Sequence, residues 1–250
     1  MYVDVHCHIE REAFDADRES VIEKARKAGV TKIIVSGTDQ NSNRQVMELT
    51  AKHPDILRCS LGIYPSHAVG IEEPTINVDD ELKFITENKD KIAGLGECGL
   101  DFTYERKEEQ KKVFAKVIET CEKTGLPIIV HTRKAEQECI EMLEKSKLKK
   151  VILHCFMGRK NLVKKAAALG YSFSVPPIII RNQQFQQLVE IVGISQLLTE
   201  TDAPWLSGTP GARNEPVEVI RTVEEIARIK GFAVEETKQT IFLNYQRMFE

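Results

Sequence analysis

Histidines and carboxylates in this sequence stand where short apolar runs end, a position suited to metal chemistry. The first run ends in His6-Cys7-His8. Side chains two residues apart on a strand lie on the same face, so both imidazoles can reach one metal ion. Four further apolar runs end in a titratable residue: Glu97, His131, His154 and Asp202. This recurrence indicates a shared metal centre rather than isolated polar residues.

The six residues supply four imidazoles and two carboxylates, which is enough for two divalent ions roughly 3.5–4 Å apart. We expect Glu97 to bridge two such ions. Imidazole donors favour Zn²⁺ or Mn²⁺ over Ca²⁺. One or two divalent ions are therefore expected, and Mg²⁺, Zn²⁺ and Mn²⁺ are the candidates.

Two carboxylates are the expected catalytic groups. A divalent ion lowers the pKa of a water bound beside it. Asp202 is expected to be the general base for that water, with Glu97 as the second catalytic carboxylate. Glu200 points to the same side as Asp202, one layer deeper. It either orients a histidine ligand or is a buried structural carboxylate paired with a base.

The elements that must position these residues alternate along the chain. Short β-branched runs predict strands at 2–6, 32–36, 58–61, 91–95, 127–131, 151–154, 171–175 and 196–201. Amphipathic segments predict helices near 18–28, 40–52, 79–88, 106–124, 134–146, 159–169, 183–192 and 216–230, and a last helix near 234–247. Eight alternating pairs predict an α/β fold, a single (β/α)8 TIM barrel with an extra C-terminal helix. A doubly wound open sheet is the rival, and no linker divides the one expected domain, 1–250.

Composition excludes several classes of protein. The 250 residues carry 35 Lys and Arg against 38 Asp and Glu, a net charge of −3, so no large basic field coats nucleic acid. Six cysteines without a CxxC pair predict reduced thiols rather than a disulfide framework. The sequence shows no apolar run of about 18 residues and no signal sequence. We therefore expect a cytoplasmic protein without membrane association.

Five segments of the sequence resemble the motifs of the TatD family of metal-dependent deoxyribonucleases, within the amidohydrolase superfamily. They are Asp4-Val5-His6-Cys7-His8, Gly94-Leu95-Gly96-Glu97-Cys98-Gly99-Leu100-Asp101-Phe102, His131-Thr132-Arg133, Leu153-His154-Cys155-Phe156-Met157-Gly158 and Glu200-Thr201-Asp202-Ala203-Pro204-Trp205-Leu206. The match spans essentially the whole chain, in order. The resemblance implies a TIM barrel, a centre of one or two metals and phosphodiester hydrolysis. It implies as metal ligands His6, His8, Glu97, His131, His154 and Asp202.

One loop departs from the family pattern. The family often has His-Pro-His after the third strand, whereas this chain has Gly62-Ile63-Tyr64-Pro65-Ser66-His67. Tyr64 and Ser66 stand where the histidines would be, and His67 comes one place later. Tyr64 either stacks on a base or packs within the loop. His67 is a candidate for the acid that protonates the leaving oxygen.

Cations and one aromatic residue near the expected site suit a phosphate-bearing substrate. Arg133 and Arg213 can hold a phosphate with a bidentate fork. Lys134 and Lys160 begin helices and are expected to be solvated. Trp205, the one tryptophan, either stacks on a nucleobase, as in single-strand binders, or packs its loop.

Three functions compete on this evidence. The first is a metal-dependent deoxyribonuclease acting on DNA, single-stranded or at a strand end, by exonucleolytic cleavage. The second is a related amidohydrolase-superfamily enzyme that attacks an amide, a phosphotriester or an aminoacyl-tRNA ester. A lysine at the fourth-strand ligand position would favour the amide branch, but Glu97 stands there. The third is a non-catalytic adaptor barrel, which has no use for six converging ligands. No obligate protein partner is indicated.

Overall fold

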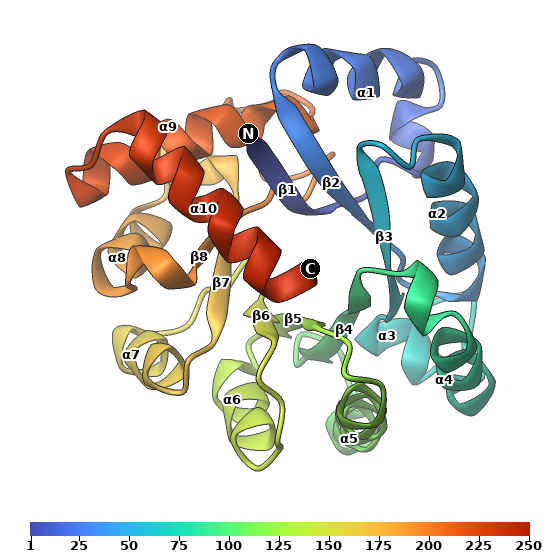
Figure 1. Cartoon of the computed structure of the whole chain (residues 1–250). Coiled ribbons are helices and arrows are strands. Elements are labelled where there is room, and N and C mark those ends of the chain that lie inside the picture. The colour runs from blue at the N-terminus through green and yellow to red at the C-terminus, as the bar shows by residue number, and fades with distance from the viewer.

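Eight parallel strands form the centre of the computed structural model, which describes residues 1–250. Each strand pairs with the next one in chain order, so they follow one another around a barrel (Figure 1). The strands are β1 (Tyr2–Cys7), β2 (Val30–Ser36), β3 (Leu57–Ile63), β4 (Gly94–Asp101), β5 (Ile128–Arg133), β6 (Val151–Leu153), β7 (Ser172–Val175) and β8 (Leu197–Thr199). The Asp202 amide, just beyond β8, donates to the His6 carbonyl of β1 at 2.9 Å and brings the last strand back to the first.

Helices surround the barrel and cover one of its ends. They are α1 (Arg18–Lys27), α2 (Gln40–Lys52), α3 (Pro65–Ala68), α4 (Val78–Glu87), α5 (Lys107–Thr124), α6 (Glu136–Glu144), α7 (Lys160–Ala168), α8 (Gln183–Ile191), α9 (Val219–Lys230) and α10 (Val234–Phe249). Figure 1 shows α10 crossing the end at which the strands begin. There Asn244 Nδ2 donates to the Leu197 carbonyl at 2.7 Å. The opposite end, where the strands finish, is left for the βα loops.

The predicted TIM barrel with its additional C-terminal helix is confirmed. The main difference in the elements concerns β4, which runs over Gly94–Asp101 rather than 91–95. Its glycines carry no strand propensity, yet β4 lies against β5 so closely that only glycine fits. A Cβ on Gly99, whose φ is +141°, would lie 2.1 Å from the His131 carbonyl oxygen. Glu97 therefore lies within a strand and not after one.

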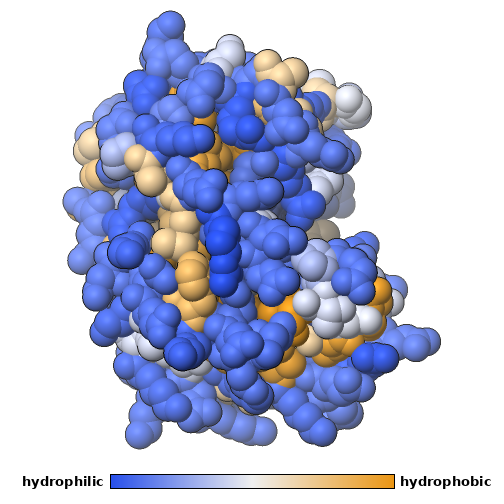
Figure 2. Space-filling view, turned by 90° about the vertical axis from the view of Figure 1, so that its right-hand side faces the viewer, coloured by the Kyte–Doolittle hydropathy of each residue, from blue (hydrophilic) through white to orange (hydrophobic).

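The interior and the surface have the expected division of polarity. A cluster of 63 buried apolar residues fills the space between the strands and the helices. All six cysteines are free, as predicted. Figure 2 views the side of the barrel that faces right in Figure 1, and most of that surface is hydrophilic, with apolar residues in separate patches. None of the helices is both long and apolar enough to span a bilayer.

Gly62 allows β3 to lie against the backbone that carries Glu97. A Cβ at this position would lie 2.2 Å from the Gly37 carbonyl oxygen and 2.4 Å from the Glu97 nitrogen. The side-chain amide of Asn43 also donates to the Gly62 carbonyl oxygen and accepts from the Gly62 backbone amide, each at 2.9 Å. These two bonds leave β3 little freedom to shift. The position of Glu97 thus depends on the absence of a side chain one strand away.

We expect Gly62→Ala to destabilise the protein by about 1–3 kcal/mol, the usual cost of overpacking a rigid interior. The measurement is the free energy of unfolding from urea denaturation. Gly193→Ala is the matched control, because Gly193 has φ −60° and no atom within 3.4 Å of an added Cβ. Equal stability of the two variants would show that the backbone around Glu97 is not tightly constrained.

Candidate metal centre

A cavity of about 1100 Å³ opens at the end of the barrel where the strands finish. Five of the six predicted ligands line it: His8, Glu97, His131, His154 and Asp202. The sixth, His6, is fully buried and lies directly behind them. The structure therefore brings together all six residues singled out from the sequence. They come from β1, β4 and β5 and from the segments that follow β1, β6 and β8.

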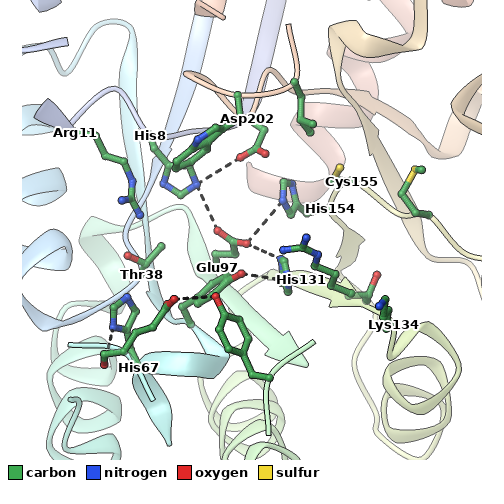
Figure 3. Close-up of a pocket in the computed structure, with 18 of the residues that line it drawn as sticks. His8, Arg11, Thr38, His67, Glu97, His131, Lys134, His154, Cys155 and Asp202 are labelled. Atoms are coloured by element: carbon green, nitrogen blue, oxygen red, sulfur yellow. Dashed lines mark hydrogen bonds and ion pairs between the residues drawn. The ribbon is translucent and has the colours of Figure 1, made fainter. Parts of the chain in front are cut away.

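Glu97 lies at the centre of these residues (Figure 3). Its Oε2 is 3.3 Å from His8 Nε2 and 3.5 Å from His6 Nε2. Its Oε1 is 2.8 Å from His131 Nδ1 and 3.8 Å from His154 Nε2. One carboxylate thus faces four imidazoles, two with each oxygen.

Asp202 approaches the same imidazoles from the segment after β8. Its Oδ1 is 3.6 Å from the Nε2 atoms of both His6 and His8. Those two nitrogens are themselves only 3.1 Å apart. Two groups of donor atoms converge within 4.8 Å: His6, Glu97 and His154, and His6, His8 and Asp202. Nitrogen and carboxylate donors at this density fit a divalent metal ion.

Two serines on neighbouring strands hold the imidazoles of β1. His8 Nδ1 is 2.8 Å from the Ser36 carbonyl oxygen, and His6 Nδ1 is 3.0 Å from Ser36 Oγ. Ser60 Oγ donates to Ser36 Oγ at 2.9 Å. These bonds engage the Nδ1 atoms and leave both Nε2 atoms facing the centre, the arrangement that orients metal-binding histidines. The sequence analysis missed both serines, whose only signal is that Ser36 ends β2 and Ser60 lies in the middle of β3, each on a buried strand.

Glu200 holds His154 in a similar way. Its Oε2 is 2.7 Å from His154 Nδ1 and accepts a hydrogen bond from Ser174 Oγ at 2.5 Å. Its Oε1 accepts from the Cys155 amide at 2.9 Å. Glu200 is fully buried, so of the two expected roles the geometry matches the one in which it orients a histidine.

Asp101 is a further residue that the sequence analysis did not single out. It is fully buried, and its Oδ2 lies 3.4 Å from both His131 Nε2 and the Tyr64 hydroxyl. The side chain of Gln110 accepts a hydrogen bond from the Asp101 backbone amide at 2.9 Å and donates one to the Asp101 carbonyl oxygen at 3.0 Å. Asp101 comes four residues after Glu97 on β4. The two-residue period of a strand would have placed both on the inner face, had the strand boundaries been recognised.

Burial and neighbouring charges set the protonation of the site. Burial lowers the pKa of His6 to about 4. Burial also favours the neutral form of His8 and His154, but nearby carboxylates outweigh it. Glu10 and Glu97 raise the pKa of His8 to about 10. Glu200 is the main carboxylate that raises the pKa of His154 to about 9. Burial alone would raise the pKa of Glu97, but hydrogen bonds from His131, His6 and His8 hold it well below its usual range. Burial raises the pKa of Asp202 to about 6.

Four of the five predicted substrate contacts line the cavity: Arg133, Tyr64, His67 and Trp205. The Tyr64 ring packs against His131 with centroids 4.9 Å apart, and the His67 Nδ1 atom is 3.3 Å from the Glu72 carbonyl oxygen. Trp205 is 47% exposed. The guanidinium of Arg11 lies 5.1 Å from the centre of its ring.

Arg213 does not line this cavity. Its guanidinium donates to both carboxylate oxygens of Asp17, at 2.9 and 2.6 Å, and to Glu215 at 3.1 Å. It also lies 4.5 Å from the centre of the Phe14 ring. Arg213 therefore ties the loop after β8 to the segment before α1, and its donors are engaged by protein groups.

Comparison with known proteins agrees with this geometry. Residues 3–250 match the model of the family described as TatD related DNase. The human protein named Deoxyribonuclease TATDN3 is 34% identical, over 99% of this chain and 94% of its own. A protein of Erwinia tasmaniensis named 3'-5' ssDNA/RNA exonuclease TatD is 30% identical, over 98% of each chain. The crystal structure of the TatD homologue YJJV from Escherichia coli superimposes with a TM-score of 0.90 at 25% identity, over 99% of this chain and 97% of that one. The chain therefore belongs to the TatD related DNase family.

Proposed function

We propose that this chain is a metal-dependent deoxyribonuclease that hydrolyses phosphodiester bonds from the end of a single DNA strand. The observation that carries the proposal is the single buried carboxylate of Glu97 facing four imidazoles at the floor of an open cavity. Membership of the TatD related DNase family supports the reaction. The strand preference draws support from the Erwinia relative, whose name specifies single-stranded DNA and RNA.

Six side chains would hold one or two divalent ions, with Mg²⁺, Mn²⁺ and Zn²⁺ as candidates. We assign His6, His8, Glu97, His131, His154 and Asp202 to this role. Divalent ions in such a site polarise the phosphoryl group and lower the pKa of water. His6 belongs to both groups of donors, and the carboxylate of Glu97, which faces two imidazoles with each oxygen, would be shared if two ions bind.

Asp202 would act as the general base. Its carboxylate borders the cavity and keeps 15% of its side-chain surface exposed, so water can reach it. A pKa of about 6 leaves Asp202 ionised at neutral pH and close to the pKa of an effective base. Asp202 Oδ would accept the proton of the attacking water, while Glu97 stays ionised and holds the imidazoles in place.

Arg133 and Trp205 would bind the substrate. Arg133 follows the His131 ligand by two residues, lines the cavity and makes no ion pair with a protein carboxylate, which leaves its guanidinium available to a phosphate. Trp205 offers an exposed aromatic face at the same opening, and stacking on such a face tolerates any base. An adaptor function would leave this combination of donors, cation and aromatic face without a role.

Asp202→Asn is expected to lower turnover of single-stranded DNA by at least roughly 10², the typical contribution of a general base. The amide keeps the shape of the carboxylate but cannot take the proton. DNA affinity should change far less, because Arg133 still binds phosphate. The measurement is kcat on an end-labelled oligonucleotide at saturating metal, with metal content determined in parallel.

Asp90→Asn is the matched control for Asp202→Asn, because Asp90 is exposed at the opposite end of the barrel. It should behave as the wild type does. An Asp202→Asn enzyme that binds metal fully and turns over within about threefold of wild type would remove Asp202 from the proton transfer.

The double substitution of His6 and His8 by Ala should abolish stoichiometric metal binding while the circular dichroism spectrum stays that of a folded barrel. Metal content after dialysis, by elemental analysis, provides the readout. His53→Ala, remote from the cavity on the chain after α2, should retain the wild-type metal content. Full metal content in the double variant would refute the assignment of the two β1 histidines.

Metal binding at neutral pH is expected to release at least one proton per protein. His8 and His154 have pKa values of about 10 and about 9 in the metal-free protein, so both carry a proton at pH 7 that a bound metal must displace. Affinity should accordingly rise as the pH increases from 6 to 9. Calorimetry in two buffers of different ionisation enthalpy measures the released protons. A heat that does not depend on the buffer would contradict the assignment.

A further inference from the structure

A second hollow, of about 400 Å³, lies between α7 and α8. The two helices lie side by side in Figure 1 and are in contact. Both begin at the end of the barrel that carries the cavity, because each follows the carboxyl end of a strand. We call this hollow the α7–α8 groove. It is lined by Gly158, Arg159, Lys160, Val163, Gln183, Gln184, Gln187, Leu188 and Ile191.

The segment after β6 lines both the catalytic cavity and the α7–α8 groove. His154, Cys155 and Met157 line the cavity, and Gly158, the next residue, lines the groove. The side-chain amide of Gln184 on α8 donates to the carbonyl oxygens of Met157 and Gly158. These two bonds join α8 to the segment after β6, at the point in the chain where the lining of the cavity gives way to that of the groove.

The lining of the groove has the chemistry of a site for a polyanion. Its floor is apolar and consists of Val163, Leu188 and Ile191. Arg159 and Lys160 are exposed on one wall, and neither makes an ion pair or a side-chain hydrogen bond with the protein. No carboxylate lines the groove, although the chain has 38 acidic residues. The opposite wall presents the amides of Gln183 and Gln187, which also have no protein partner.

Positive and negative side chains lie on different sides of the catalytic cavity. Arg133 and Lys134, which follow β5, line the wall nearest to β6 and the groove, and neither is paired with a carboxylate. Glu136 is the one acidic residue of that wall. Glu72 and Glu73, in the loop between α3 and α4, line the cavity from another side and would repel phosphates. Apart from Arg11, which lies beside Trp205, the cations of the lining are on the wall nearest to the groove, so a polyanion whose end lay in the metal centre would be attracted toward that wall.

We propose that the α7–α8 groove binds the sugar–phosphate backbone of the single DNA strand whose end lies in the metal centre. Arg159 and Lys160 contact phosphates, the apolar floor contacts sugar faces, and the two glutamines hydrogen-bond to backbone or base atoms. The inference rests on the proposed function, because it takes the occupant to be the same strand. It makes the groove a determinant of affinity for long strands and leaves the hydrolysis of the terminal bond to the metal centre.

The test compares a strand that reaches the groove with one that does not. In Arg159→Gln/Lys160→Gln, the KM for a single-stranded 12-nucleotide DNA should rise at least about tenfold with kcat unchanged, as expected for loss of a binding contact. Hydrolysis of a dinucleotide, which is too short to leave the cavity, should stay within about twofold. Affinity of the metal-loaded enzyme for a phosphorothioate 12-mer, measured by fluorescence anisotropy, should show a salt slope reduced by about 1.4 for two lost contacts to a single strand.

Lys89→Gln/Lys91→Gln is the matched control, because it removes the same charge from exposed lysines ahead of β4, at the opposite end of the barrel. It should leave both KM values and the salt slope unchanged. A second groove variant, Gln187→Glu, should also raise the KM for the 12-mer alone.

Three results would overturn the proposal. The first is an equal rise in the KM for the 12-mer in the groove and control variants, which would show that only the overall charge of the protein matters. The second is an equal loss on the dinucleotide, which would place the defect in the metal centre. The third is competition by a ten-residue poly-glutamate peptide at the same concentration as the 12-mer, which would identify a site for acidic peptides. Anisotropy does not require cleavage, so a wild-type enzyme that binds the 12-mer through the groove without hydrolysing it would contradict the proposed function alone.

Discussion

The interaction on which the site depends is the burial of one carboxylate, Glu97, among four imidazoles. Removing one partner from a buried pair of charges costs about 3–5 kcal/mol, so the Glu97 carboxylate and the protonated His8 beside it stabilise each other's burial. His6 lies on β1 and His131 on β5, while His8 and His154 directly follow β1 and β6. The barrel gathers the carboxyl ends of these strands around one point. The contacts between Glu97 and the four imidazoles thus depend on the arrangement of strands from across the whole barrel.

A second layer of buried polar groups makes this arrangement rigid. Ser36 and Ser60 fix the two β1 histidines, and Glu200 fixes His154. Ser36 lies on β2 and Ser60 on β3, whereas Glu200 directly follows β8. Of the residues proposed to contact the substrate, Arg133 is the last residue of β5 and Trp205 stands on the loop after β8. The metal-binding donors thus lie on strands or within three residues of their carboxyl ends, and the exposed aromatic face lies farther out, on a loop.

The barrel and the set of converging donors could be predicted from the sequence, because the alternation of elements and the polar ends of the strands are local patterns. The boundaries of β4 could not, because its glycines mask the strand while meeting a need for close backbone approach that only the folded structure shows. The pairing of Arg213 with Asp17 joins residues far apart in the chain. The α7–α8 groove could not be predicted, because it depends on how two helices pack. Lys160 is exposed, as its position at a helix start predicts, and it also lines this hollow.

The central claim is that Glu97 lies at the heart of a metal centre, and anomalous diffraction tests it most directly. Crystals grown with Zn²⁺ and measured on both sides of the zinc absorption edge locate the ion independently of any assumption about ligands. The account predicts an anomalous peak about 2.0–2.2 Å from a carboxylate oxygen of Glu97, with imidazole nitrogens at about 2.0–2.1 Å from the same peak. Zinc peaks confined to surface residues, with none within bonding distance of Glu97, would contradict it.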